Sequence, residues 1–440
     1  MKRPNVVILV IDTLREDHSQ GLERLRKLGF IKYENAIAPA PWTLPSHVSI
    51  ITGLHPSQHG IHESFGVYVD REMMELSTSQ LSKLNHGVIG ELMDEGYNTY
   101  IISANPFLSQ PYGFNKYTRS VITGYVVLDR VRSINEYESI KHLDELGRRY
   151  GYFGTVKHII SDGRLDLLFL GIKTVLMRRL RRLGAVLGLI DLTMDKGALT
   201  IINLLKDLTL NEPFLLLINI MEAHSPYTNK DLSERISFEA YHKAVFEDVI
   251  DSKAVSIWRR EYPRHAKYAV NKALDIVLTL SRYLDNTLFV VTSDHGELLG
   301  DGGIHHGYFL KDGLLRVPLW VKWPSWFKAP RQVKPFVSLT EIPSMIRAVI
   351  NNDMDYGVGS SIAISESFGS LLFSSYEAKY RSLNPETLVR VFSHRIRVYT
   401  SKCVFTYNES LDAVEDNGCE GSTAKHIIDV IRYMLNKFNF

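Results

Sequence analysis

Cysteine is scarce in this chain of 440 residues, which contains only Cys403 and Cys419. Two cysteines are too few for the disulfide framework of a small secreted fold, and their scarcity is typical of a reducing compartment. One disulfide between them remains an option. We therefore expect a cytoplasmic protein without a disulfide framework.

Charge of one sign and long apolar runs are also scarce. The 51 lysines and arginines nearly balance 49 aspartates and glutamates, so no strong field attracts nucleic acid, and we expect no nucleic-acid partner. No run is long and uncharged enough to cross a bilayer. The first apolar run, residues 6–11, follows basic residues as in a signal peptide. Because Asp12 and Arg15 stand where a cleavage region should be small and neutral, we interpret this run as a buried strand.

Strand and helix patterns alternate along the chain. The run at residues 6–11 is rich in β-branched side chains, which is typical of a central parallel strand covered on both faces. Further strands are expected at residues 99–102, 214–220, 288–292 and 317–321, and helices at 87–95 and 269–283. This alternation predicts an α/β fold, with a large, mostly parallel sheet sandwiched between helices. Ligands collect at the carboxyl ends of such strands, so Asp12, the segment 222–224 and Asp294 should share one edge.

Two regions depart from this alternation. From about residue 125 to 210 the sequence is helical and rich in charge, which predicts a helical insertion. Within it, residues 167–190 combine large apolar side chains with Lys173, Arg178, Arg179, Arg181 and Arg182. Such a helix either packs on the core with a solvated basic face or lies on an anionic membrane. Residues 351–440 are expected to form a smaller C-terminal α+β part, with a strand at 399–407 and a closing helix at 424–438.

The clearest local signal surrounds Thr43. Pro45 suits the first turn of a helix, because its missing N–H would have no partner there, and an apolar helical pattern follows at residues 48–52. Thr43 therefore lies just ahead of a helix N-terminus, where free N–H groups and the helix dipole favour an anion. A hydroxyl in this place can act as a nucleophile. The alternative is that Thr43 only caps the helix.

A second signal follows the strand at residues 288–292. Asp294 and His295 offer an oxygen and a nitrogen ligand that can close on one cation, and Gly296 lets the backbone turn sharply beside them. Asp12, at another strand end, supplies a further carboxylate. Such Asp-His pairs are also frequent without a metal. Three signals at strand ends together favour a catalytic centre.

Histidines form the remaining signals. His224 lies after the strand at 214–220, and His306 lies in a short loop after His295. Either ring can protonate a leaving oxygen or bind an oxyanion near neutral pH. Pro226 favours an extended loop, and therefore an exposed His224 ring. The alternative, a buried histidine satisfied by the backbone, is the interpretation that we favour for His305.

Five motifs carry a resemblance to a known family. They lie at residues 4–15, 43–53, 223–227, 293–297 and 316–319, in the order seen in sulfatases of the alkaline phosphatase superfamily. From residue 4 to about 350 the chain therefore resembles a sulfatase catalytic domain, and we expect this domain over residues 1–350. The helical insertion and residues 351–440 lie outside the resemblance.

The resemblance implies an alkaline phosphatase-like fold, with metal and nucleophile at the carboxyl edge of the sheet. By position, the residues that resemble metal ligands are Asp12, Thr43, Asp294 and His295. Thr43 also falls on the nucleophile position. His224 and His306 resemble the pair that binds substrate and serves the leaving group.

Three departures from the family pattern bear on the substrate. Sulfatases need cysteine or serine at the nucleophile position, since these are oxidised to formylglycine, and Thr43 cannot give that aldehyde. Thr13 stands where many sulfatases have a second aspartate, which leaves one ligand fewer unless Asp17 or a water compensates. His47 replaces an arginine and is expected to bind substrate. The departures favour phosphorus over sulfur.

These observations predict a metal-dependent hydrolase that cleaves phosphate mono- or diesters, or sulfate esters, through Thr43. One divalent cation is expected per site, Ca, Mg, Mn or Zn, because a two-metal site would need a further Asp-x-x-x-His pair. One alternative is a phosphotransferase of the phosphoethanolamine or glycerol-phosphate type, acting on a lipid or glycan acceptor near a membrane. Another is a hydrolase of the arylsulfatase type. A binding protein without catalysis is less consistent with an intact set of ligands and nucleophile.

Overall fold

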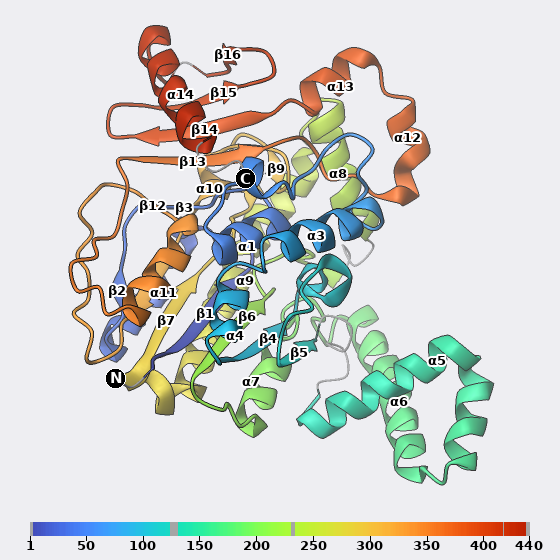
Figure 1. The fold of residues 1–440 in the computed structure, drawn as a ribbon. Helices are drawn as coiled ribbons and strands as arrows, with labels where there is room; N and C mark the ends of the chain where they lie inside the picture. The colour runs from blue at the N-terminus through green and yellow to red at the C-terminus, as the bar shows by residue number, and fades with distance from the viewer. Residues whose placement is uncertain (1–2, 124–130, 230–233, 417, 437–440) are drawn as a thin grey trace.

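A computed structural model describes residues 3–123, 131–229, 234–416 and 418–436 of the chain (Figure 1). A seven-stranded sheet lies at the centre, in the order β2-β11-β7-β1-β6-β4-β5. Its parallel strands are β1 (Asn5–Ile11), β4 (Asn98–Ser103), β5 (Arg119–Ile122), β6 (Phe214–Ile220) and β7 (Thr287–Thr292). At one edge, β11 (Leu319–Lys322) runs antiparallel to β7 and pairs with β2 (Ile31–Lys32). The expected mostly parallel α/β sheet is confirmed.

Helices cover both faces of this sheet. All seven residues of β1 are buried, and their side chains enter two cores in alternation. One core lies under α7 (Ala198–Asp207) and α9 (Ser252–Thr279). The other lies under α1 (Thr43–Thr52), α4 (Val88–Asp94) and α11 (Ile342–Ile350). Because both faces are covered, a strand without polar alternation is the stable choice.

Prolines explain two differences from the expected elements. The strand expected at 317–321 is broken at Pro318, which has no N–H for a ladder. Its first part, β10 (Arg316–Val317), joins a small sheet with β3 (Ala36–Ile37) and β12 (Val337–Ser338), and β11 joins the large sheet. Helix α9 begins well before the expected residue 269 because it continues across Pro263. The helix expected at 87–95 is present as α4.

The C-terminal part contains an antiparallel sheet of β13 (Ile362–Ser367), β14 (Arg395–Thr400), β15 (Val404–Asn408) and β16 (Ala413–Val414). The single strand expected at 399–407 is therefore wrong. The chain reverses there, because the Thr400 hydroxyl accepts hydrogen bonds from the N–H groups of Lys402 and Cys403. Helix α14 (Gly421–Asn436) packs on this sheet, and residues 437–438 of the expected closing helix lie outside the described residues.

Two contacts fix the C-terminal part. Cys403 and Cys419 form the optional disulfide, with Cα atoms 5.3 Å apart. The Glu366 N–H donates to the carbonyl of Pro39, 2.9 Å away, in the segment that leads to α1. The C-terminal sheet thus lies against the catalytic part of the chain (Figure 1).

The helical insertion forms a hairpin of α5 (Ile134–Ser161) and α6 (Leu165–Val186), which projects from the body beyond the β5 edge of the sheet (Figure 1). Residues 125–130 of the expected insertion lie outside the described residues, and α7, within its expected limits, packs in the main core. The other α-helices and strands are α2 (Pro56–His59), α3 (Glu72–Lys83), α8 (Glu234–Phe246), α10 (Asp312–Leu315), α12 (Glu377–Arg381), α13 (Pro385–Val391), β8 (Leu298–Leu299) and β9 (Ile304–His305). No helix within the described ranges combines the length and the apolar character needed to span a membrane.

Candidate active site

Two neighbouring strands of the large sheet deliver three side chains to one place. Asp12 follows β1, and Asp294 and His295 follow β7, its parallel neighbour. Each of the three side chains offers a ligand atom, and these atoms all lie within 4.8 Å of one another. All three residues are completely buried. The strand-end rule therefore brings together the residues that resemble metal ligands, and we call this set the ligand group.

The ligand group contains two buried oxygens without a partner. Within the described residues, Asp12 Oδ1 and Asp294 Oδ2 accept no hydrogen bond. Burial raises the pKa of Asp294 to about 7 and also raises that of Asp12, where the nearby Asp294 carboxylate adds to the effect. Unpaired buried carboxylate oxygens are costly. A cation between them would remove this cost, so the group fits a divalent metal.

The His295 ring is oriented toward the same space. Its Nδ1 donates to the carbonyl of Gly296, 2.9 Å away, and burial lowers the pKa of His295, which keeps the ring neutral. The lone pair therefore belongs to Nε2, which lies 3.5 Å from Asp294 Oδ2 and 3.8 Å from Asp12 Oδ1. A neutral imidazole tied through its other nitrogen is the usual state of a metal ligand.

Thr43 lies at the edge of the ligand group. It is the first residue of α1, and Trp42 stands at the N-cap without a side-chain capping bond. The Thr43 hydroxyl oxygen lies 3.4 Å from His295 Nε2 and accepts from Asn105 Nδ2, also at 3.4 Å. The hydroxyl thus points to the ligand group rather than capping the helix, beside the free N–H groups of the first turn of α1.

His47, one turn along α1, is completely buried behind Thr43. Its Nδ1 donates to the Thr43 carbonyl at 2.9 Å and lies 3.4 Å from Asp294 Oδ2, while its Nε2 lies 3.4 Å from Asn219 Nδ2. Both ring nitrogens are engaged inside the protein. These contacts make His47 a positioning residue for the ligand group, and its expected contact with substrate stays a prediction.

Two further imidazole rings line the site, and one nitrogen of each is held by a hydrogen bond within the protein. His224 Nδ1 donates to the Ser225 carbonyl at 2.6 Å, and His306 Nδ1 donates to Glu297 Oε1 at 3.1 Å. The His306 ring centre lies 4.9 Å from that of His224 and 4.7 Å from that of His295. Within the described residues, Nε2 of His224 and of His306 has no hydrogen-bond partner. The extended loop at Pro226 predicted an exposed His224 ring, but the residue is only partly exposed.

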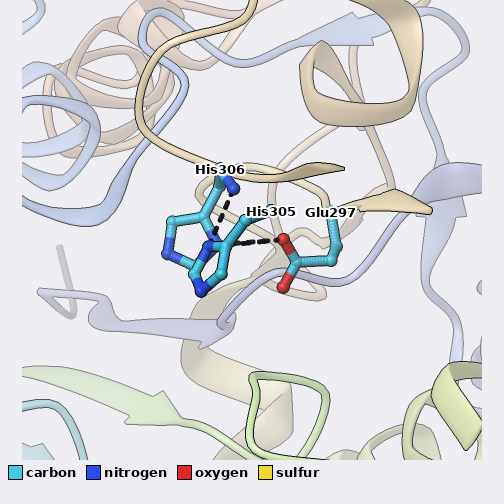
Figure 2. Close-up of side chains that lie close together, drawn as sticks. All are labelled: Glu297, His305 and His306. Atoms are coloured by element: carbon cyan, nitrogen blue, oxygen red, sulfur yellow. Dashed lines mark hydrogen bonds and ion pairs between the residues drawn. The ribbon is translucent and has the colours of Figure 1, made fainter. Parts of the chain in front are cut away.

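Glu297, His305 and His306 form a second group of possible metal ligands within 4.8 Å (Figure 2). Hydrogen bonds already occupy Nδ1 of both histidines and both carboxylate oxygens of Glu297. His305 Nδ1 accepts the His306 N–H at 2.9 Å, and Glu297 Oε2 accepts the Tyr227 hydroxyl at 2.7 Å. Glu297 Oε1 accepts from His306. The group therefore orients His306, and His305 is a largely buried histidine satisfied by the backbone, as favoured from the sequence.

Thr13 and Asp17 do not replace the absent second carboxylate. The Thr13 hydroxyl donates to the Asp12 carbonyl at 2.7 Å, and its N–H donates to Asp294 Oδ1 at 3.3 Å. Asp17 forms two hydrogen bonds with Arg15, each 2.8 Å long, outside the ligand group. Glu222, at the end of β6, accepts the N–H of Ala198 at 2.8 Å and so caps α7 instead of facing the site.

Sequence reasoning missed two asparagines. Asn105 Nδ2 donates to Asp12 Oδ2 at 2.8 Å, and Asn219 Nδ2 lies 3.4 Å from the same oxygen. Asn105 follows β4, so the strand-end rule that selected Asp12 would also have found it. Asn219 lies within β6, where an isolated polar residue in an apolar run is the only signal.

Comparisons with known proteins agree with this fold. The family model described as Sulfatase matches residues 4–350. An arylsulfatase of Clostridium perfringens (strain 13 / Type A) is 21% identical over 387 residues, which are 79% of this chain and 74% of that protein. A phosphonate monoester hydrolase from Silicibacter pomeroyi has a similar structure, with a TM-score of 0.53 and 14% identity over 99% of this chain and 95% of that one. A 2-O GAG sulfatase gives a TM-score of 0.56 and 11% identity over 99% and 92% of the two chains.

Proposed function

Because this chain belongs to the sulfatase family, we propose that this ester hydrolase cleaves phosphate mono- or diesters with Thr43 as its nucleophile. The supporting observation is the place of the Thr43 hydroxyl, on the first residue of α1 and 3.4 Å from His295 Nε2 in the ligand group. Hydrolases of this family act on esters, and the proposal concerns the phosphoryl group of the ester.

Asp12, Asp294 and His295 would hold one divalent cation, with Thr43 Oγ1 as a further ligand. Two unpaired carboxylate oxygens and one neutral imidazole suit Ca, Mg, Mn or Zn. A cation bound there lowers the pKa of the threonine hydroxyl and neutralises charge on the phosphoryl oxygens.

Thr43 Oγ1 gives up its hydroxyl proton to solvent and attacks phosphorus in line, so that the Oγ1–P bond forms while the bond from phosphorus to the leaving oxygen breaks. The free N–H groups at the start of α1 stabilise the phosphoryl anion. His224, whose Nδ1 is held by the Ser225 carbonyl, gives a proton from Nε2 to the leaving oxygen.

Water then attacks the phosphothreonine, the Oγ1–P bond breaks, and the departing Thr43 oxygen takes a proton from solvent to restore the hydroxyl. Burial lowers the pKa of His306 well below its ordinary value, so the ring is neutral and Nε2 can accept a proton from the attacking water. An alcohol in place of water would give the transferase alternative. The two outcomes differ only in the acceptor.

The choice of phosphate over sulfate rests on Thr43 itself. Family members that cleave sulfate esters convert cysteine or serine at this position to formylglycine. Threonine has a methyl group on Cβ and no route to that aldehyde. Sulfate ester cleavage of the arylsulfatase type therefore stands as the second candidate.

Substitution of Thr43 tests this proposal. We expect Thr43→Ala to lower turnover of aryl phosphate mono- and diesters by on the order of 10³-fold or more, and Thr43→Ser to stay within about tenfold of wild type. Turnover is measured with nitrophenyl phosphate, bis-nitrophenyl phosphate and nitrophenyl sulfate, each with Mg²⁺, Mn²⁺, Ca²⁺ and Zn²⁺. Mass spectrometry of quenched reactions should find a phosphoryl group on the peptide that contains Thr43.

Thr52→Ala is the matched control, because it also removes a hydroxyl from α1. The Thr52 hydroxyl donates to the Val48 carbonyl. This substitution should leave turnover unchanged. Wild-type turnover in Thr43→Ala would refute the nucleophile. Faster hydrolysis of the sulfate ester than of both phosphate esters would refute the substrate class.

A further inference from the structure

Exposed apolar side chains are concentrated on one part of the molecule. More than half of the large apolar side chains that are exposed in the described residues lie between residues 150 and 189, in the α5–α6 hairpin. Monomeric soluble proteins rarely expose contiguous apolar patches of this kind without a function. The sequence allowed this region either to pack on the core or to meet a membrane. The exposed apolar side chains of α6 do not pack on the core.

Helix α6 carries these side chains in a regular stripe. Leu165, Phe169, Ile172, Leu176, Leu180 and Leu183 follow one another at intervals of three or four residues, and each is more than half exposed. This spacing places them on one face of the helix. The opposite face packs on α5, where Leu167 is buried. The stripe is therefore exposed on the hairpin, and its members Ile172 and Leu176 also line the groove between α6 and α5.

Basic side chains flank the apolar stripe. Arg179 is three residues after Leu176 and four before Leu183, so it lies against the stripe, and Arg182 follows one turn later. Both are exposed, and neither forms an ion pair with a described residue. Residues 147–186 contain nine lysines and arginines against two aspartates, and no acidic residue occurs from 167 to 190.

Aromatic side chains mark the bend in α5. The helix is interrupted at Gly151, which has a φ of 67°, and the next two residues, Tyr152 and Phe153, are 85% and 95% exposed. Exposed aromatic rings of this kind are favoured at the boundary between lipid headgroups and acyl chains. They add a second apolar feature to the hairpin.

We propose that the α5–α6 hairpin docks on an anionic lipid surface, with the α6 stripe in the headgroup layer and Arg179 and Arg182 beside the lipid phosphates. An apolar stripe with a basic border is the pattern of an interfacial helix, since long basic side chains reach the phosphates while their stems cover apolar surface. A second copy of this chain would present the same positive border, and like charges oppose that pairing. This inference does not depend on the proposed reaction.

The root of the hairpin lies next to the catalytic loop. Asn229 donates from Nδ2 to the Ile190 carbonyl at 2.8 Å and accepts the Leu192 N–H at 3.0 Å. Asn229 is five residues after His224. The segment that returns from the hairpin is thus hydrogen-bonded to the loop that carries this histidine, and docking would hold that loop near the lipid surface.

Vesicle flotation tests the proposal with the full chain. We expect wild type to float with phosphatidylcholine vesicles that contain phosphatidylglycerol, and to float far less with phosphatidylcholine alone or at high salt. Arg179→Glu with Arg182→Glu should weaken binding by about tenfold or more. Phe169→Ser with Leu176→Ser should abolish it at every salt concentration. Hydrolysis of a soluble ester should stay at the wild-type rate in both variants, which reports an intact fold.

Matched controls come from parts of the chain outside the hairpin. Lys328→Glu with Arg331→Glu makes the same change of charge, and Val333→Ser with Leu411→Ser removes exposed apolar side chains elsewhere. Both should float like wild type. Absence of wild-type flotation, or equal loss in the controls, would overturn the proposal. Light scattering that finds a dimer, converted to monomer by Phe169→Ser with Leu176→Ser, would overturn it in favour of a second copy.

Discussion

Individual side chains around the ligand group have little freedom, because most of their polar atoms are committed to other parts of the protein. His47 ties the Thr43 carbonyl to Asp294, Glu297 holds His306, and Asn105 links Asp12 to Thr43. Such contacts fix the direction of a ligand's lone pair without taking part in the reaction. Activity should therefore depend on residues that need not touch the substrate.

Asn105 gives the sharpest test of this dependence. We expect Asn105→Ala to lower turnover by about 10- to 100-fold, because Asp12 Oδ2 loses its donor at 2.8 Å and Thr43 Oγ1 loses its donor at 3.4 Å. Asn98→Ala is the control, at the start of the strand that precedes Asn105, since its Nδ2 donates to the Asn211 carbonyl. Steady-state kinetics measures the turnover of both variants, and thermal melting measures their stability. Equal turnover in both variants would contradict the positioning role.

At the scale of secondary-structure elements, the loop after β7 approaches α10 closely at Gly296, the residue between His295 and Glu297. The sequence suggested that this glycine permits a sharp turn. Its φ lies outside the left-handed region, and the structure gives a different reason. A Cβ at Gly296 would lie 2.1 Å from the Gly313 carbonyl oxygen, in the backbone of α10. The strand end that carries Asp294 and His295 can therefore approach α10 only without a side chain here.

Two glycine substitutions should have opposite effects. Gly296→Ala must displace backbone, so we expect it to destabilise the protein by on the order of 3 kcal/mol or more and to abolish activity. Gly147→Ala, inside α5, meets no atom within 4 Å and should stabilise that helix by roughly 0.5–1 kcal/mol. Urea unfolding monitored by circular dichroism measures both. A Gly296→Ala protein as stable as wild type would show that the loop adapts.

At the scale of the whole molecule, the buried carboxylate of Glu63 connects the residue before α1 with the C-terminal part. Its Oε2 accepts from Trp42 Nε1 at 2.7 Å, next to Thr43, and its Oε1 accepts from Ser367 Oγ and the Phe368 N–H, each at 3.3 Å. The C-terminal part and Trp42, the residue that precedes Thr43, are therefore held by the same carboxylate. Burial raises the pKa of Glu63 to about 7 from an ordinary value of 4.5.

This carboxyl group should make stability depend on pH. The unfolded chain loses the proton near pH 4.5 and the folded protein keeps it to about pH 7, so the free energy of unfolding should fall as pH rises through that window, by at most about 3 kcal/mol. Glu63→Gln should remove this part of the slope. Glu420→Gln, at an exposed site, should keep it. Unfolding of both variants at pH 5, 6 and 7 checks the difference, and parallel slopes would contradict it.

Much of this architecture could be predicted from the sequence, for a physical reason. A strand buried on both faces must be apolar throughout, so β1 and β7 are visible, and the polar residues that follow, Asp12, Asp294 and His295, meet because the strands are parallel neighbours. Asn105 obeys the same rule and was visible in principle. The hairpin of β14 and β15 was not, because its turn depends on the Thr400 side chain rather than on glycine or proline.

Contacts between distant segments could not be predicted. The place of α9 across Pro263 and the contact of Glu63 with Ser367 depend on tertiary packing, which overrides local preference, whereas the division of a strand at Pro318 follows from proline itself. The hairpin's helices were predictable from their periodicity. Which face of α6 turns outward was not, because that depends on how α5 packs against it.

The segment that leads to Thr43 is bonded on several sides. The Ala38 N–H donates to the Leu315 carbonyl, the Pro39 carbonyl accepts from Glu366, and the Pro41 carbonyl accepts from Gly307, all at 2.8 to 2.9 Å. Each bond comes from a different stretch of chain. The hydroxyl is consequently aimed before any substrate arrives, and the entropy of aiming it is lost once, when the chain folds, instead of in every catalytic cycle.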